Sequence, residues 1–568
     1  MPCPRGCRSE RPRSQNPRSR RPDNAQRAIE GGRLTYKRWI LVAAVLASGI
    51  VFLDSTVVNV ALPRIGRDLP RSLFGVLEGQ SYVYNAYLLT LSTLLILAGA
   101  INDYYGRRRT FAIGLAGFGA TSVLCGLAPS MELLVLFRIL QGAAGALLVP
   151  GSLALLTANF SGEEQGRAFG VWAGASAATT VLGPFVGGIL VDTISWRAAF
   201  LLNVPLVVLA LWATLKHVPE SRDEQASGQF DWLGAAVVGL AVGGLAFGAI
   251  YGQERNWKDP IGYIALAIGV VATAALPIVM IRRPNPLIPP GLFRSRNFTV
   301  TNISTLLIYG ALYVTGYYLA IFQQGTIGYT AAAAGLAFVP GTLFLIFFSS
   351  RFGKLGAKFG PRWFMAAGPA IMALGVLWLA RVPAESVPWA LRPSQPSTFL
   401  PPLSYVTDFL PGAIAFGVGL MILVAPLTTA LMTSVPVRNS GVGSAINNAI
   451  SRVGPQLAGA LIFVFITANF YGYLAGKLSG VDVNSTAFRT AVSPLNKPLD
   501  ANLVGAVRDA STASFHIAML VAALLLILGA LANAIGIQNA AAKKPVEQTA
   551  KPEPAGATSG GQAAQERS

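Results

Sequence analysis

Residues 99–109 read GAINDYYGRRR, which places glycines at 99 and 106, an aspartate at 103 and three arginines at the end. This stretch follows an apolar segment that is long enough to cross a bilayer as a helix. A second copy, GKLGAKFGPR at residues 353–362, keeps the seven-residue spacing between its outer glycines. Each copy follows the second apolar segment of its half of the chain. The sequence therefore predicts an internally duplicated membrane protein, with a binding site between the two halves near mid-membrane.

Composition predicts the same class. Of the 568 residues, 53% are hydrophobic and 12% are charged, whereas about a quarter of the residues of a soluble domain are charged. Fourteen segments have the roughly 20 apolar residues that span a hydrocarbon core of about 30 Å. Their limits are 39–62, 80–101, 110–127, 132–157, 167–191, 197–215, 232–251, 261–281, 298–323, 332–350, 363–380, 405–432, 441–468 and 513–537. The predicted fold class is an all-α membrane protein with fourteen transmembrane helices.

These segments divide the chain into two six-helix bundles, related by pseudo-symmetry, plus two extra central helices. The N-terminal bundle is expected at residues 39–216 and the C-terminal bundle at 298–537. The linker at 217–297 contains the two extra transmembrane helices. Residues 1–38 and 538–568 are expected to be disordered cytoplasmic tails, because their composition is polar and of low complexity.

Charge gives the predicted orientation. The formal net charge is +19, and residues 1–38 contain eleven basic and three acidic side chains. Basic residues also gather in three links, at 107–109, 282–296 and 351–362. By the positive-inside rule these links and both termini are cytoplasmic, in a multi-pass protein of the cell (inner) membrane. The link at 63–79 disagrees, since it is predicted to be external and carries three arginines. The basic tail suits anionic lipid better than nucleic acid.

The sequence contains little that suggests an enzyme. The three cysteines, Cys3, Cys7 and Cys125, do not form a disulfide or metal-site pattern. There is no nucleotide-binding loop and no cluster of His or Cys. We therefore expect no enzymatic activity, no cofactor and no metal, with a proton gradient as the energy source.

Three further stretches accompany residues 99–109. They are LDSTVVNVALP at 53–63, RILQG at 138–142 and GPFVGG at 183–188, and WRAAFLLNVP follows at 196–205. In combination these motifs resemble the Major Facilitator Superfamily, and specifically its fourteen-span drug:proton antiporter branch of the EmrB/QacA type. Two positions depart from the family pattern. Tyr104 stands where a basic residue is usual, and Ala357 stands in the place of the acid in the second copy of the loop.

The resemblance implies proton-coupled efflux (antiport) of lipophilic cationic or neutral drugs and toxic compounds across the cytoplasmic membrane. The implied partners are a small-molecule substrate, protons and the lipid bilayer, with no nucleic acid. A periplasmic adaptor is added if the source has an outer membrane. The same scaffold also suits a dedicated exporter of an endogenous metabolite, or a solute importer. A non-transporting receptor or enzyme is a third alternative, which the combined acid, arginine and glycine motifs argue against.

Asp54 is the predicted centre of proton exchange. It lies roughly 22 Å into the membrane at 1.5 Å per residue, where an ionised carboxylate costs at least ~2.5 kcal/mol unless it is paired. Arg138 enters from the opposite surface to a similar depth, and Gln141 lies on the same helix face. We expect Arg138 to hold Asp54 ionised until substrate or a conformational change separates them, with Gln141 as a bridge and Asn59 in the same group. The alternatives are a structural acid bonded to Thr or Asn neighbours and an arginine that ties helices together through carbonyls.

Four residues form the predicted conformational gate: Gly99, Asp103, Gly106 and Arg107. Asp103 and Arg107 are four residues apart, so they can form a salt bridge if the third helix begins at this loop. A bridge between two halves that rock can latch the outward-facing state and be remade in each cycle.

A second group is expected to act through helix packing, and comprises Gly174, Gly183, Pro184, Gly187 and Gly188. Glycines four residues apart let a neighbouring helix approach closely, and a proline permits bending because it removes one backbone hydrogen bond. The resemblance implies that this packing closes the pathway to protons; generic helix packing is the alternative.

Tyr309, Tyr313 and Tyr317 repeat at four-residue spacing, which gives one aromatic face on the ninth segment. Such a face can hold a lipophilic cation by its rings, and ordinary packing is the alternative. Arg452 lies in the middle of the thirteenth segment. We include these four residues in a predicted substrate cavity, although the sequence names no partner for Arg452.

Overall fold

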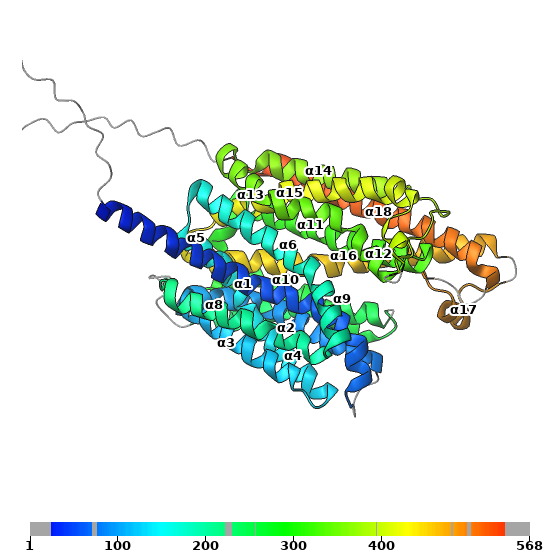
Figure 1. Ribbon diagram of the computed structural model, residues 1–568, viewed down its shortest axis with the longest axis horizontal. Coiled ribbons are helices and arrows are strands. Elements are labelled where there is room, and N and C mark those ends of the chain that lie inside the picture. The colour runs from blue at the N-terminus through cyan, green and yellow to red at the C-terminus, as the bar shows by residue number, and fades with distance from the viewer. Residues whose placement is uncertain are drawn as a thin grey trace, which may run out of the picture.

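The computed structural model describes residues 24–70, 76–221, 230–255, 257–392, 395–478, 481–496 and 501–539. All regular secondary structure in these ranges is helical, and most of the long helices run along one common direction (Figure 1). Within the same ranges, twelve helical segments are long and apolar enough to cross a membrane. The predicted all-α membrane class is therefore confirmed, whereas the predicted count of fourteen spans is not.

The N-terminal half contains eight helices among the described residues. They are α1 (Asn24–Asp68), α2 (Val76–Tyr105), α3 (Arg107–Gly126), α4 (Met131–Ala146), α5 (Leu148–Asn159), α6 (Gly162–Thr193), α7 (Trp196–Leu201) and α8 (Asn203–His217). α3 and α6 coincide with predicted segments but are not among the twelve. α1 begins at Asn24, so the predicted disordered tail is wrong for residues 24–38, and residues 1–23 lie outside the described part.

Two of the spans in this half are broken helices. α4 and α5 form one candidate span that breaks at Leu147, and α7 and α8 form another that breaks at Leu202. Each break lies three residues before a proline, Pro150 or Pro205, which lacks an N–H and crowds the carbonyl four residues earlier. At the first break, the Asn102 side chain donates to the Leu147 carbonyl at 3.1 Å. The second break places Asn203 at the start of α8.

The rest of the chain holds the central pair and the C-terminal half. Its elements are α9 (Trp232–Glu254), α10 (Pro260–Arg282), η1 (Pro290–Arg294), α11 (Arg296–Ile321), η2 (Phe322–Ile327), α12 (Ala331–Ala337), α13 (Val339–Phe359), α14 (Arg362–Leu379), η3 (Pro396–Phe399), η4 (Tyr405–Phe409), α15 (Leu410–Thr433), η5 (Val437–Asn439), α16 (Ser440–Lys477), α17 (Thr486–Ala491), η6 (Ala501–Leu503) and α18 (Val504–Gly536). Of the predicted C-terminal tail, residues 540–568 lie outside the described part.

The two halves meet along two pairs of helices, α2 with α16 and α6 with α13. Glycine makes both contacts close. A Cβ atom on Gly99 would lie 2.5 Å from the carbonyl oxygen of Gly441, and one on Gly166 would collide with the Gly353 carbonyl. Gly353 belongs to the second copy of the loop motif, so that copy forms a packing surface for the other half. Figure 1 shows the halves as two adjacent bundles, with α3, α4 and α8 in one and α14, α15 and α18 in the other.

α9 and α10 form a hairpin beside the junction of the halves, since α9 packs on both α2 and α16. Asp231 closes the base of this hairpin. Its carboxylate accepts from the Gly234 N–H at 2.9 Å, from Arg283 Nε at 3.0 Å and from the Leu287 N–H at 3.2 Å. Burial alone raises the pKa of Asp231, but these hydrogen bonds outweigh it and leave the pKa below its usual value.

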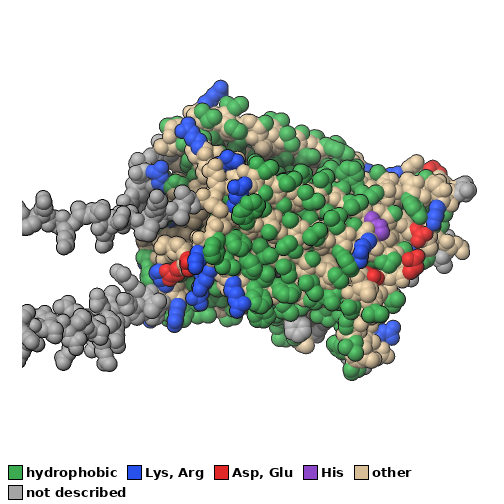
Figure 2. All heavy atoms as spheres, turned by 90° about the horizontal axis from the view of Figure 1, so that it is seen from above, with side chains coloured by type: hydrophobic (Ala, Val, Ile, Leu, Met, Phe, Trp, Pro, Cys, Tyr) green, Lys and Arg blue, Asp and Glu red, His purple; other side chains and the backbone are tan. Residues whose placement is uncertain are grey.

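Charge is unevenly distributed along the molecule. Figure 2 shows Lys and Arg side chains concentrated at the end where α1 begins and α18 ends, while the middle of the visible face is largely hydrophobic. The close contacts of Gly99 and Gly166 lie toward this basic end. Gly99 is eight residues before Arg107, and Gly353, which Gly166 contacts, is five residues before Lys358 on α13.

Candidate functional site

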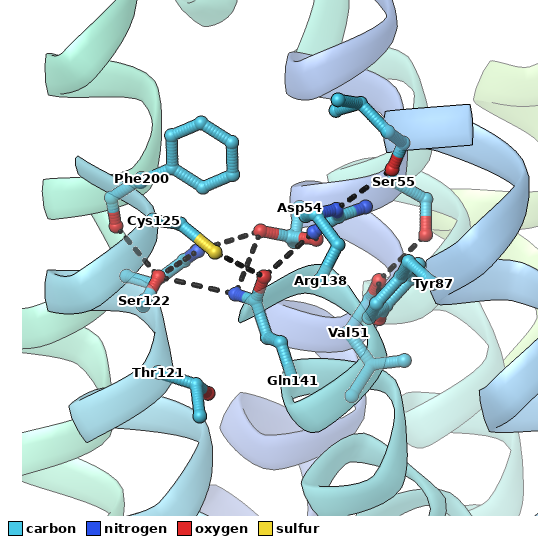
Figure 3. A network of polar contacts seen from close by, with 12 residues as sticks. Val51, Asp54, Ser55, Tyr87, Thr121, Ser122, Cys125, Arg138, Gln141 and Phe200 are labelled. Carbon is cyan, nitrogen blue, oxygen red and sulfur yellow. Dashed lines mark hydrogen bonds and ion pairs between the residues drawn. The ribbon is translucent and has the colours of Figure 1, made fainter. Parts of the chain in front are cut away.

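Asp54 and Arg138 form a buried ion pair inside the N-terminal half. Arg138 Nη1 lies 2.5 Å from Asp54 Oδ2, and both side chains are 0% exposed. Asp54 comes from the middle of α1 and Arg138 from the second turn of α4. The structure therefore brings together the two residues that the sequence placed at similar depth (Figure 3).

Two amides complete the surroundings of the carboxylate. Gln141 Nε2 donates to Asp54 Oδ1 at 3.1 Å while its Oε1 accepts from Arg138 Nη1 at 2.7 Å, which is the bridging position expected from sequence. Asn203 Nδ2 donates to the same Asp54 oxygen at 3.0 Å. Ser122 Oγ accepts from both amides and donates to the Phe200 carbonyl at 2.9 Å. Asp54 thus accepts three hydrogen bonds from two other helices, and α3 supports them through Ser122.

Arg138 is held on its other side by α2. Its Nε donates to the Val83 carbonyl at 3.1 Å, and its guanidinium lies 4.0 Å from the centre of the Tyr87 ring. Tyr87 in turn donates to the Val51 carbonyl at 3.2 Å. Arg138 Nη2 and Asn203 Oδ1 are buried without a hydrogen-bond partner among the described residues. The arginine therefore keeps one donor free.

In this conformation the Asp54 carboxylate is paired with a guanidinium and accepts hydrogen bonds from two amides. Separating a buried ion pair leaves an uncompensated charge, which costs about 3–5 kcal/mol. Protonation of Asp54 removes that cost, because a neutral acid no longer needs the cation. Since the pair is inaccessible to water here, uptake or release of a proton requires the surrounding helices to move. The site therefore holds a buried carboxylate that water can reach only after the surrounding helices move.

The predicted gate residues form a second buried ion pair, at the junction of the halves. Arg107 Nη2 and Nε lie 2.8 and 3.1 Å from Asp103 Oδ1, because α3 begins at Arg107, one helical turn after Asp103. The other half completes the group. Asp103 Oδ2 accepts from the Val442 N–H at 2.9 Å, and Arg107 donates to the carbonyls of Val437 and Arg438. The pair thus ties α2 to the start of α16.

Gly106 has a local reason to be glycine. Its φ is +106°, a conformation that side chains rarely adopt, and a Cβ atom there would lie 2.8 Å from Glu220. Glu220 accepts from the backbone N–H groups of Arg108 and Arg109 at 3.0 and 3.1 Å. An anion at the N-terminus of α3 is favourable because it satisfies free N–H groups and the helix dipole. Sequence analysis did not assign Glu220 a role.

The predicted packing glycines do not all share one role. A Cβ atom on Gly183 would collide with Thr56, and one on Gly187 would lie 3.0 Å from Val57, so both permit close contact of α6 with α1 just after Asp54. A Cβ on Gly174 would lie 3.0 Å from Ser349 Oγ on α13, in the other half. Gly188 has no atom within 4 Å of a Cβ position, so its predicted packing role is wrong. Pro184 lies within α6, and its side chain is outside the described part.

Asn59 does not join the Asp54 group. It is exposed, and successive residues of a helix turn by about 100°, which puts a residue five positions on roughly 140° away from Asp54. Asn203 occupies the position beside Asp54 that was predicted for Asn59. In the sequence, Asn203 is marked only by its place in the WRAAFLLNVP motif of the sixth predicted segment.

The three tyrosines of α11 are not equivalent. The rings of Tyr309 and Tyr313 lie 6.3 Å apart, while Tyr317 contacts Tyr318 instead. Tyr309 is partly buried, whereas Tyr313 is 52% and Tyr317 is 62% exposed. Arg452 lies on α16, electrostatically close to Tyr313 and to Tyr84 and Tyr87 of the other half. Tyr313 and Arg452 are thus electrostatic neighbours, and their role in a substrate cavity stays a prediction.

Comparison with known families agrees with this geometry. The family model described as Major Facilitator Superfamily matches residues 44–460. The chain belongs to this superfamily. Members of the Major Facilitator Superfamily are transporters, so the protein is a non-enzymatic membrane transporter, as the sequence predicted.

Similar members of the superfamily carry resistance and export names. The chain is 33% identical to the puromycin resistance protein pur8 of Streptomyces alboniger, over 77% of this chain and 83% of that protein. It is 30% identical to the tetracenomycin C resistance and export protein of Streptomyces glaucescens, over 83% of each. It is 32% identical to the multidrug resistance protein Stp of Mycobacterium tuberculosis, over 74% of each.

A solved structure has a similar fold. It is the human organic anion transporter MFSD10, with a TM-score of 0.53 and 12% identity, covering 86% of this chain and 99% of that one. At this level of identity the similarity concerns the fold alone.

Proposed function

We propose that this protein exports lipophilic drug-like compounds across the cytoplasmic membrane in exchange for protons. The observation that carries the proposal is the buried Asp54–Arg138 pair, in a superfamily member whose relatives include named resistance and export proteins. The pair supplies one carboxylate that can take up a proton when the helices around it rearrange. It also gives a reason for coupling, since the protonated and ionised forms favour different positions of Arg138.

The contacts between the two halves support an outward-facing conformation. The Asp103–Arg107 pair and the glycine contacts of Gly99 and Gly166 join the halves toward the basic end. The positive-inside rule assigns that end, and both termini, to the cytoplasm. The cytoplasmic end is then closed, and opening it requires α16 to leave the buried carboxylate of Asp103.

The fourteen-span arrangement is part of the proposal. α3 has 20 residues and so is about 30 Å long, and it packs between α4 and α8. α6 has 32 residues and packs on α1 and α13. Both helices lie alongside candidate spans, which supports adding them to the twelve.

Transport in an efflux-deficient bacterial host tests the proposal. Tetracenomycin C, which appears in the name of one relative, is the first compound to assay. We expect the chain to lower its accumulation, a protonophore to restore it, and Asp54→Asn to abolish the effect. Asp68→Asn is the matched control, because Asp68 forms an exposed pair with Arg64. Efflux that survives the protonophore, or is unchanged in Asp54→Asn, would contradict proton exchange.

A further inference from the structure

Arg452 is a cation in the membrane interior that the ion pairs described above leave unexplained. It lies twelve residues into α16, so it is about 18 Å from the start of that helix. Its Nε is buried without a hydrogen-bond partner, and the structure gives the side chain no ion pair among the described residues. The side chain is partly exposed, and a charged group at this depth faces a cavity or pairs with a partner, which points to a partner that arrives from outside the chain.

The surroundings of Arg452 come from both halves. Its electrostatic neighbours are the phenols of Tyr84 and Tyr87 on α2 and of Tyr313 on α11, and no carboxylate is among them. Tyr84 and Tyr87 also interact with Arg138. The two tyrosines of α2 are therefore electrostatic neighbours of both arginines, Arg138 of the buried pair and Arg452 of α16.

The charge balance of this region is positive. Arg138 is offset by Asp54 at 2.5 Å, whereas Arg452 has no such counterpart. The region keeps one positive charge while Asp54 is ionised and has two once Asp54 is protonated. A cationic compound would be repelled by Arg452 in both cases, since like charges in a low-dielectric site interact strongly. The phenols and aromatic rings add hydrogen-bond donors and apolar area but no negative charge.

A ligand with an acidic oxygen suits these groups best. A guanidinium presents a planar fork of donors that matches a carboxylate or a similar oxygen pair. Tyr87 is fully buried and already donates to the Val51 carbonyl, but the hydroxyls of Tyr84 and Tyr313 can donate to the same oxygens. The ring of Tyr313 can pack against an aromatic body. Tyr313 is half exposed, so part of this surface is open to a ligand.

We propose that Arg452 anchors the substrate and selects amphipathic compounds that carry an acidic oxygen, such as a carboxylate or a phenolate. The inference rests on the proposed export function, because it assigns a substrate class to that transporter. It differs from the sequence prediction of cationic or neutral substrates, which considered Asp54 without the free charge on α16.

The test uses two probes that share a ring system and differ in charge, 1-pyrenebutyric acid and 1-pyrenebutylamine. The full-length protein is placed in lipid nanodiscs without a proton gradient, and binding is measured against empty nanodiscs. We expect the wild type to bind the acid at least tenfold more tightly than the amine. Arg452→Gln should lose at least tenfold in affinity for the acid and keep or gain affinity for the amine. Arg351→Gln, which changes an exposed arginine near the basic end, should behave as wild type.

Two results would overturn the inference: a wild type that prefers the amine, or an acid-to-amine ratio that Arg452→Gln leaves unchanged. If Arg452→Gln does not fold, Arg452→Lys decides, because it keeps the charge and removes the fork. At least threefold weaker binding of the acid supports the inference, and unchanged binding overturns it. A failure of proton exchange would appear in the efflux assay with protonophore. The binding measurement is made at equilibrium without a proton gradient, so its result is independent of proton exchange.

Discussion

The Asp54 carboxylate depends on amide side chains as well as on Arg138. Asn203 and Gln141 donate to one of its oxygens, and Ser122 fixes both amides. Hydrogen bonds to a charged group contribute about 1.5–3 kcal/mol. The position of the amides therefore matters to the stability of the buried Asp54–Arg138 pair.

Replacing Asn203 should therefore impair transport. We expect Asn203→Ala to lower the rate of export about tenfold, since it removes a donor from a buried carboxylate. Asn59→Ala is the matched control, because Asn59 is exposed on another face of α1, and it should stay within about twofold of wild type. Initial rates of efflux, normalised to the amount of protein in the membrane, measure both. Equal loss in the two variants would show that Asn203 has no special part in the site.

Removing the cation of the buried pair should destabilise the protein more than removing both charges. Arg138→Ala leaves an ionised acid without its cation, so we expect a loss of about 3–5 kcal/mol in the free energy of unfolding unless Asp54 becomes protonated. The double variant Asp54→Asn with Arg138→Ala should recover part of that loss. Thermal unfolding in detergent compares the variants, and additive losses would contradict a coupled pair.

Arg138 and Gln141 could be predicted because one short motif placed them at a depth that matches Asp54. Asn203 and Glu220 could not be assigned in the same way. Asn203 lies 149 residues from its partner and Glu220 lies 112 from Arg108, and no local spacing relates such pairs. Asn59 belongs to the same motif as Asp54, but it lies roughly 140° around α1 from Asp54 and is exposed.

At the scale of helices, the two halves touch through backbone where α2 meets α16. Gly99 lies against Gly441 and Ala445, and Gly441 lies against Asp103. A side chain at position 99 would push the helices apart, so the contact depends on the absence of a Cβ atom.

We expect Gly99→Ala to weaken this contact and to lower export about tenfold, because a Cβ would lie 2.5 Å from Gly441 O. Gly188→Ala is the control, since a Cβ there meets no atom within 4 Å. Reactivity of Ser440→Cys, at the buried start of α16, in a chain with Cys3, Cys7 and Cys125 replaced by Ser, reports opening of the junction. Greater labelling in the Gly99→Ala background is expected, and equal labelling in both backgrounds would contradict it.

The α9–α10 hairpin provides a test by pH. The pKa of Asp231 is below its usual 3.8 in the folded protein, so its contribution to stability is complete above that value and is lost as the pH falls through the lower folded pKa. Asp231→Asn should therefore lower the melting temperature at pH 7, and the difference from wild type should shrink below about pH 4. Asp68→Asn should show a much smaller difference. A gap that persists undiminished at pH 3 would contradict the role of the ionised carboxylate.

The long apolar segments could be predicted from hydropathy, but the breaks within them could not. Pro150 and Pro205 lie inside apolar runs, and a proline can bend a helix or interrupt it. The outcome depends on the side chains that surround the break. At Leu147, Asn102 donates to the carbonyl next to the one that Pro150 frees, from a helix that the local sequence does not identify.

At the scale of the whole molecule, the two glycine-rich loop copies lie at the helix pairs that join the halves, α2 with α16 and α6 with α13. The loops themselves have diverged in role. The first copy carries the Asp103–Arg107 pair, whereas the second has Ala357 and contributes Gly353 to packing against α6. With Ala357 in place of an acid, the second copy cannot form the ion pair of the first, and it contributes a packing surface instead.

The charge of the substrate determines how the membrane potential acts on the transporter. If an acid leaves as one proton enters, two charges move inward per cycle, and 100 mV contributes about 4.6 kcal/mol, twice the roughly 2.3 kcal/mol per charge. Exchange of a monovalent cation for a proton would move no net charge. We expect a potassium diffusion potential, negative inside, to accelerate export of 1-pyrenebutyrate from proteoliposomes. Arg351→Gln should respond alike, and a rate independent of the potential would contradict an anionic substrate.

The complete burial of Asp54 also affects a cell that has nothing to expel. A carboxylate that no water reaches cannot relay hydrogen ions on its own. Under the proposed function, the resting protein should therefore not dissipate the proton gradient, even when it is abundant.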